Sequence, residues 1–172
     1  MKKFIFTAFL FCLIGTLGAN AQKFAFIDTE LILSQIDEFK ANEDKIEQQA
    51  KVYQAEVQKM GEEVEKLYKN LQENAKKLSE AQLEKQQAEI QKKEAAVMEQ
   101  GRKYFGPEGA IAQMKEKLLN PFYDKIYEAS KQVAIQYDYA AIIDRATASS
   151  VIFAQPKHDI SNEILSVMGY SK

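Results

Sequence analysis

Two carboxylates are the first candidates for chemistry in this sequence. Asp28 and Asp144 each end a short run of β-branched and aromatic residues. Two carboxylates brought together could act as a general acid and a general base. A carboxylate at the end of a strand also serves in turns, where it accepts hydrogen bonds from nearby backbone N–H groups. We favour the turn interpretation for both residues.

Other side chains that commonly do chemistry are sparse. His158, the only histidine, stands in a polar stretch, where we expect a solvated loop residue. The only cysteine, Cys12, falls in the leader described below, so the chain that follows has no thiol for catalysis or metal binding. Tyr104 and Phe105 could form a binding patch, although helix packing is the simpler explanation. The common phosphate-binding, dinucleotide-binding and zinc-protease motifs are absent from the sequence. We therefore expect no enzyme activity, no metal and no cofactor, and we rank an exported enzyme last.

The first 21 residues have the pattern of a secretory signal peptide. Lys2 and Lys3 precede an apolar run, and a small-residue motif ending at Ala21 follows it. We expect cleavage after Ala21, so that the mature chain begins at Gln22. An uncleaved anchor is the alternative, which the short apolar run disfavours. The remaining 21 basic and 25 acidic residues give a formal net charge of −4, which disfavours nonspecific nucleic-acid binding.

The longest pattern in the chain is a heptad repeat between residues 39 and 78. Its apolar residues alternate at spacings of four and three, which is typical of a helix with one stripe facing another helix. A helix of this length would extend about 55 Å, whereas a compact domain of this size has a radius of gyration of about 15 Å. We therefore expect a protruding arm, with a helix of a globular bundle as the alternative. The stripe consists of Ile46, Ala50, Tyr53, Val57, Met60, Val64, Leu67, Leu71 and Leu78.

Residues 79–110 predict the return half of a helical hairpin. Ser79 and Gln82 fit a capping box, which places the start of the second helix at the tip. The apolar stripe of this helix is thin, so the arm should flex along its length. Gly101 and the run from Gly106 to Gly109 should interrupt the helix with a kink or a short loop. The stripe consists of Leu83, Ile90, Val97 and Tyr104.

The C-terminal half predicts a packed body. Helical periodicity resumes at Ile111, and Pro121 should bend this helix because proline lacks the N–H and crowds the preceding turn. A last helix should cover residues 160–168, with Asp159 as its N-cap and Gly169 as its stop.

Three short strands complete the prediction for the two ends of the chain. They cover residues 23–28, 139–144 and 151–154, which are rich in aromatic and β-branched residues. Thr29 is the candidate cap of a short helix, and Asp37 that of the long one. Such a core is small for one chain, and sharing it between copies would stabilise it.

The ends of the sequence resemble the Skp/OmpH family of periplasmic chaperones. The resemblance rests on the strand from Phe24 to Asp28 before a long charged hairpin, and on three C-terminal runs at 139–144, 151–154 and 159–161. It implies an α+β, mostly helical fold in a homotrimer of jellyfish shape, with strands of three chains in the body and hairpins around a cavity. It also implies an ATP-independent holdase that prevents aggregation of unfolded outer-membrane β-barrel proteins in the periplasm.

On this basis residues 22–172 form one chaperone domain, in which 22–38 and 111–172 are the body and 39–110 the arm. Candidate client contacts are apolar arm residues off the heptad stripe, for which packing against the neighbouring helix is an equal alternative: Val52, Tyr68, Met98 and Phe105. Candidate residues of the trimer body are Phe24, Phe26, Ile142, Ile143, Val151 and Phe153.

The expected partners are unfolded outer-membrane proteins and further copies of the chain, without nucleic acid or stable membrane insertion. We carry over no lipopolysaccharide site, because well-known members of the family are strongly basic and this chain is mildly acidic. A structural coiled-coil scaffold or spacer of the cell envelope is the alternative function. A scaffold should bind one folded partner, whereas a holdase should bind many unfolded ones.

Overall fold

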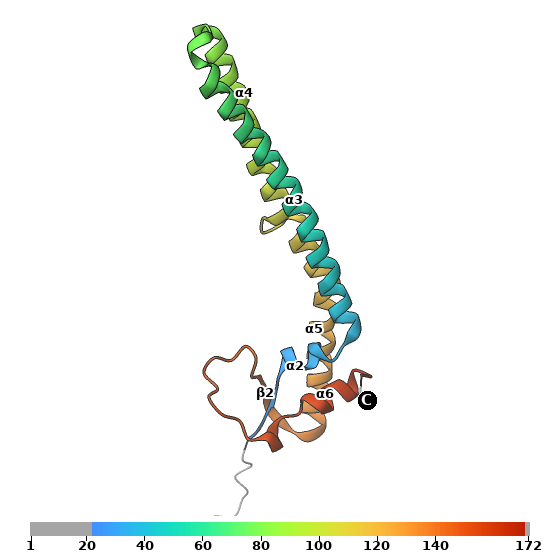
Figure 1. The fold of residues 1–172 in the computed structure, drawn as a ribbon. Coiled ribbons are helices and arrows are strands. Elements are labelled where there is room, and N and C mark those ends of the chain that lie inside the picture. Colours follow the sequence, from blue (N-terminus) through green and yellow to red (C-terminus); the bar gives the residue numbers. More distant parts are fainter. Residues whose placement is uncertain (1–21, 171–172) are drawn as a thin grey trace, which may run out of the picture.

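A long helical hairpin projects from a small body at the two ends of the chain (Figure 1). The structure, a computed structural model, describes residues 22–170, and the predicted signal peptide lies outside this range. Helix α3 (Asp37–Asn74) runs outward, and a 3₁₀ turn, η1 (Ala75–Lys77), forms the tip. Helices α4 (Glu80–Phe105) and α5 (Ala110–Tyr137) return to the body. The predicted protruding arm and the mostly helical α+β fold are confirmed.

The heptad stripe of α3 is the face that meets the returning helix. Ile46 and Val64 are buried, and the other stripe residues are partly buried, while most positions between them are exposed. On α4, Ile90 is buried and the rest of its predicted stripe is partly buried. The apolar seam therefore closes within one hairpin, as a spacing averaging 3.5 residues allows.

The capping box at the tip is formed as predicted. The Ser79 N–H donates to the Gln82 side chain over 2.9 Å, and the Gln82 N–H donates to Ser79 Oγ over 3.4 Å. Two backbone donors at the start of α4 are thus satisfied reciprocally, which fixes where the chain turns back.

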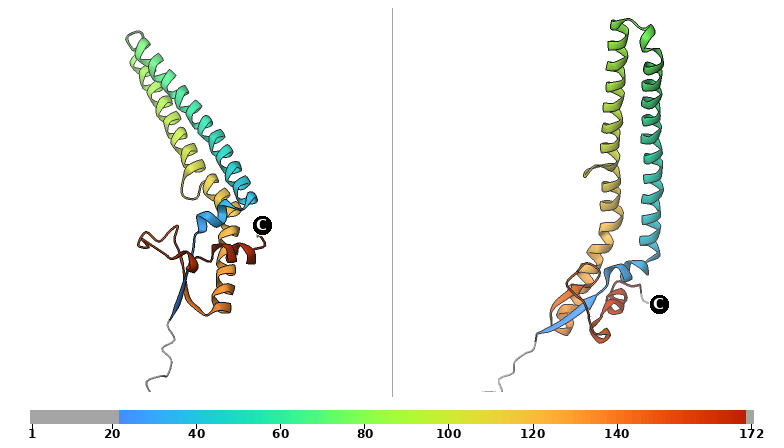
Figure 2. Two further views of the ribbon diagram at one scale, coloured as in Figure 1. Left: turned by 60° about the horizontal axis from the view of Figure 1, so that its bottom comes forward. Right: turned by 60° about the vertical axis from the view of Figure 1, so that its left-hand side comes forward.

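The loop from Gly106 to Gly109 separates α4 from α5, also as predicted, and forms a small bulge on the returning helix in Figure 2. At Gly106 a Cβ would collide with the carbonyl oxygen of Arg102. At Gly109 a Cβ would lie 2.8 Å from the carbonyl oxygen of Tyr104, closer than real side chains come. The turn therefore requires glycine at both positions.

Helix α5 connects the arm to the body without a break at Pro121. The right-hand view of Figure 2 shows its lower part leaning away from the line of the arm, consistent with the predicted bend. One turn earlier, the Leu118 carbonyl accepts a hydrogen bond from Asn42 Nδ2 over 3.2 Å. This contact ties α3 to α5 at the base of the arm.

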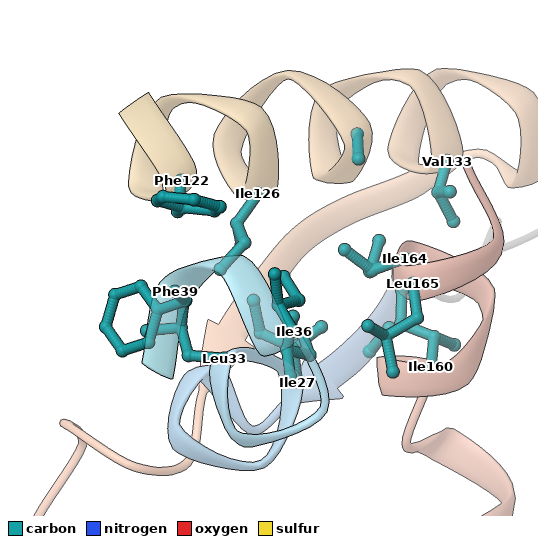
Figure 3. Packing of buried hydrophobic residues seen from close by; sticks show 13 residues of the cluster. Ile27, Leu33, Ile36, Phe39, Phe122, Ile126, Val133, Ile160, Ile164 and Leu165 are labelled. Atoms are coloured by element: carbon teal, nitrogen blue, oxygen red, sulfur yellow. The ribbon is translucent and has the colours of Figure 1, made fainter. Parts of the chain in front are cut away.

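The body is built around one apolar cluster (Figure 3). Residues from both chain ends contribute, because β1 (Lys23–Ile27), α2 (Thr29–Ser34) and α6 (Ser161–Val167) all pack against the lower half of α5. The cluster contains Ala25, Ile27, Ile32, Leu33, Ile36, Phe39, Phe122, Ile126, Ala129, Val133, Ile160, Ile164 and Leu165.

Helix starts differ from the predicted caps by one residue. Thr29 is wrong as a cap, because Asp28 holds that place and its carboxylate accepts from the Leu31 N–H over 2.9 Å. Asp37 is also wrong, because it is the first residue of α3. The cap of α6 is Ile160, although the carboxylate of Asp159 still accepts from the backbone N–H at the helix start over 3.0 Å.

The sheet contains two strands in the described residues, and they are parallel. Strand β1 pairs with β2 (Tyr139–Asp144), with Phe26 beside Ile143. The predicted third strand at 151–154 is wrong for the single chain, because this segment is irregular. The edge of β1 away from β2 is bridged at Phe26, whose carbonyl accepts from the Ile160 N–H over 2.9 Å, and the segment does not pair with β2 either.

Candidate functional site

Polar contacts join the two helices along one flank of the arm, the Glu56 flank (Val52, Glu56 and Glu63). The carboxylate of Glu56 accepts from the Tyr104 hydroxyl over 2.7 Å and from Gln100 Nε2 over 3.3 Å. Glu63 lies 3.9 Å from Lys93. The members of this flank are four and seven residues apart, so they share one side of α3.

Beneath these contacts, Tyr53 and Tyr104 stack with ring centroids 3.8 Å apart and planes 8° apart. The bond to Glu56 raises the pKa of the Tyr104 hydroxyl, because the carboxylate accepts the proton that ionisation would remove. The stacked tyrosines and the hydrogen bond to Glu56 together fix the register of α3 against α4 in the half of the arm near the body.

The opposite flank is apolar and hollow. We call it the Met98 flank (Gly61, Tyr68, Met98, Gly101 and Phe105). Its α4 members lie three and four residues apart, and its α3 members lie seven apart, so each set follows one helix face. A hollow of about 360 Å³ opens on this flank. It is lined by Gly61, Val64, Glu94, Val97 and Met98.

All four predicted client contacts are exposed. Met98 is 67 % exposed, Val52 59 %, Phe105 48 % and Tyr68 47 %. Three of them lie on the Met98 flank, whereas Val52 lies on the Glu56 flank. Phe105 meets its sequence neighbour Tyr104 edge-to-face with centroids 6.4 Å apart, which is a contact within α4 and not with α3.

Of the four predicted client contacts, Tyr68 is held by a hydrogen bond between the two helices of the arm. Its hydroxyl donates to Glu94 over 2.9 Å, and this hydrogen bond raises the pKa of the phenol. The ring remains about half exposed beside the bond. Met98 follows Glu94 by four residues, so the tyrosine ring and the methionine are neighbours on the same flank.

The predicted body residues divide between two faces of the sheet. Phe24, Phe26 and Ile143 lie on the outer face, because β1 alternates and its Ala25 and Ile27 are buried inside. Ile142 pairs beside Ala25 and packs against the inner core.

The other two predicted body residues belong to the irregular segment after β2. Val151 is half-buried, whereas Phe153 is 76 % exposed and its neighbour Ile152 is 99 % exposed. Figure 1 shows this segment extending away from the body beside β2. A chain on its own therefore leaves large apolar groups in water at this place.

The two candidate catalytic carboxylates serve turns and caps. Arg145 Nη2 lies 3.0 Å from Asp159 and 3.3 Å from Asp28, which also caps α2. Asp144 accepts from the hydroxyl of Thr29 over 2.8 Å and from its N–H over 3.2 Å. Both carboxylates thus hold the ends of the strands to the following segments, which confirms the turn interpretation.

Asp144 makes the stability of the contacts between the end of β2 and Thr29 depend on pH. Burial raises the pKa of its carboxyl group, but hydrogen bonds from Thr29, Thr147 and Ala146 outweigh that effect and lower it. The resulting stabilisation is present above the carboxyl pKa of the unfolded chain. It is lost as the pH falls through the lowered pKa of the folded state.

Between residues 22 and 170, no group of three or more acidic, histidine or cysteine side chains is arranged to hold a metal ion. No helix in that range is long and apolar enough to cross a bilayer. His158 lies exposed in the 3₁₀ turn η2 (Pro156–His158).

The predicted interruption at Gly101 is wrong, because α4 continues through it to Phe105. Sequence reasoning also missed the role of Glu94 and the common location of Gly61 and Gly101 on the Met98 flank. Their common location depends on the register of α4 against α3, which the sparse stripe of α4 left open.

The arrangement of a long hairpin on a body made from both chain ends matches a known family. The family model described as outer membrane protein (OmpH-like) matches residues 23–168, nearly all of the described chain. The chain belongs to the OmpH-like family. The resemblance of its two ends to the Skp/OmpH family is thereby confirmed.

One solved structure with the OmpH-like fold aligns over most of the chain. It is a crystal structure from Caulobacter crescentus CB15 described as an OmpH-like outer membrane chaperone. The two chains are 18 % identical, the TM-score is 0.62, and the alignment covers 88 % of this chain and 86 % of the other. A comparison with curated proteins found no match.

Proposed function

We propose that this OmpH-like protein is an ATP-independent holdase that binds unfolded outer-membrane β-barrel proteins in the periplasm and prevents their aggregation. The observation that carries the proposal is the Met98 flank, which presents three large side chains to solvent on an arm far from the body. Membership of the family and a structural neighbour described as a chaperone support the same role.

The physical basis of holding is a set of weak contacts. An unfolded β-barrel protein exposes many short apolar segments, and several arms offer them apolar side chains at high effective concentration. Binding is then tight overall while each contact exchanges quickly. Flexible methionine and exposed aromatic rings suit diverse clients better than a deep fixed pocket does.

Assembly into a homotrimer would supply several arms. A two-stranded sheet is marginal on its own, and the outer face of this one carries Phe24, which is 45 % exposed. The segment at 151–154 adds exposed Ile152 and Phe153 beside that sheet. Burial of these groups between copies would remove apolar surface from water.

Native mass spectrometry of the chain beginning at Gln22 tests the assembly. We expect the mass of three chains, and we expect Phe24→Ser combined with Phe153→Ser to shift the population toward monomer. Val52→Ser serves as the control, because it removes an exposed apolar side chain from the arm instead. A wild-type monomer would refute the shared body.

Client binding is tested on the arm with a double variant, Met98→Ser combined with Phe105→Ser. Full burial of one such side chain contributes about 1.5–3 kcal/mol, and partial burial of two gives a similar sum. We therefore expect affinity for a urea-unfolded outer-membrane barrel, measured by fluorescence anisotropy, to fall about 10- to 100-fold.

Val52→Ser, on the opposite Glu56 flank, tests the remaining predicted client contact: an unchanged affinity would confine client binding to the Met98 flank, and a similar loss would extend it to Val52. Equal affinities of the double variant and the wild type would exclude the Met98 flank as the client surface. A stable oligomer that binds no unfolded chain at all would indicate an envelope scaffold instead.

A further inference from the structure

The arm glycines are of two kinds. Gly106 and Gly109 are required, because a Cβ at either would meet backbone atoms. Gly61 and Gly101 are different, because a Cβ at either meets nothing within 4 Å. Both lie inside regular helices, where glycine is less stable than alanine. Neither close packing nor backbone conformation explains them.

These two glycines weaken the hairpin at nearly the same height. The cross-helix contacts Tyr53–Tyr104 and Glu63–Lys93 set the register of the hairpin. In this register Gly61 lies opposite Val97, and Gly101 lies opposite Val57. Four residues separate the two levels, which is about 6 Å along the arm. Each helix is thus weakened within one turn of the other, and on the same Met98 flank.

Polar contacts join the two helices close to this level. On the Glu56 flank, Glu56 binds Gln100, which is next to Gly101, and Tyr104. Toward the tip, Glu63 meets Lys93 and the Tyr68 hydroxyl donates to Glu94. On the Met98 flank, a hollow of about 360 Å³ lies beside Gly61 and extends toward Glu94. Side-chain packing on this flank is therefore incomplete beside the weakened backbone.

We propose that Gly61 and Gly101 form a hinge at which the distal arm, residues 62–96, bends toward the Met98 flank. Helices kink at glycine, where no side chain braces the turn. Bending toward the hollow closes it and brings Met98 against the Gly61 backbone. Bending the other way would widen the hollow instead.

Hydrogen exchange followed by mass spectrometry on the whole mature chain, without client, tests the hinge. After correction for intrinsic rates, residues 57–61 and 97–101 should be less protected than the helical turns on either side. Gly61→Ala and Gly101→Ala should each raise local protection roughly fivefold, the ratio set by the helix preferences of glycine and alanine.

A control variant moves the weak point. Ala88→Gly, added to the two alanine substitutions, should create new rapid exchange around residue 88 and leave the level of the former hinge protected. Wild-type protection that is uniform across residues 52–68 would overturn the proposal. So would protection that does not change in the double alanine variant.

Distances between spin labels test the location of the motion. Labels at Lys77→Cys on the tip and Glu128→Cys on the body, in one labelled chain diluted into unlabelled chains, should give a broad distribution. This distribution should narrow in the double alanine variant. The pair Gln48→Cys and Glu128→Cys, which lies below the hinge, should be narrow in both. Equal widths for the two pairs would overturn the hinge even if client binding is unaffected.

Discussion

Phe122→Ala is expected to lower the free energy of unfolding by about 3–5 kcal/mol, the usual range for removing a buried aromatic ring. Phe122 is 4 % exposed and belongs to the core of the body. Its ring meets Phe39 edge-to-face, with centroids 5.5 Å apart and planes at 85°. Because Phe39 begins the arm, the cavity left by the missing Phe122 ring would weaken both the body and the base of the arm.

Urea unfolding followed by circular dichroism measures this effect, with protomer concentration held fixed because association contributes to stability. Val52→Ala is the control, since it shortens an apolar side chain that is 59 % exposed. It should change the free energy by about 0.5 kcal/mol or less. A loss below 1 kcal/mol in Phe122→Ala would mean that the ring is not part of a packed core.

Arg145→Met is expected to destabilise the body by about 2 kcal/mol. Loss of one partner from a fully buried ion pair costs about 3–5 kcal/mol because a charge is left unpaired, and exposure of about a third of Arg145 reduces that figure. The substitution leaves the carboxylates of Asp28 and Asp159 facing each other where the guanidinium stood. Methionine keeps most of the side-chain length, so the loss reports the charge.

Lys131→Met is the matched control for Arg145→Met. It breaks the ion pair with Glu128, whose carboxylate oxygen lies 3.7 Å from Lys131 Nζ. Both side chains of this pair are more than half exposed. Such exposed pairs contribute about 0–1 kcal/mol. If both variants lose the same stability in urea unfolding, the Arg145 contacts do not hold the strand ends together.

The sequence predicted the parts of the fold that depend on local pattern. The heptad stripe, the Ser79–Gln82 capping box and the glycine loop of the returning helix all follow from residues close together in the chain. Strands β1 and β2 were also found, because their apolar runs are short and bounded by turn residues.

The errors concern partners that are distant in the chain. The run at 151–154 has the composition of a strand, but a strand also needs a neighbouring strand to pair with, and in the single chain this run pairs with neither β1 nor β2. Composition does not reveal whether such a partner is present. The caps at Thr29 and Asp37 were one residue off, because neighbouring polar residues fit the same pattern and backbone geometry decides between them.

For the candidate site, sequence alone predicted which apolar side chains lie off the heptad stripe, but not which of them share a flank of the arm. Exposure of Met98 and Phe105 follows from their place beside the α4 stripe. Their common flank with Tyr68 depends on the hydrogen bond to Glu94, and hence on how the two helices are aligned. The opposite position of Val52 depends on the same alignment.

The parallel pairing of β1 with β2 has a consequence for how the protein is made. The backbone and hydroxyl of Thr29 meet Asp144, 115 residues later in the sequence. The first strand must therefore wait, unpaired, until almost the whole chain has emerged, whereas the hairpin contains mainly local contacts. Local contacts form quickly and distant pairing slowly. The arm should thus mature before the body, and during that interval the newly made chain is itself an incompletely folded protein with an open strand edge.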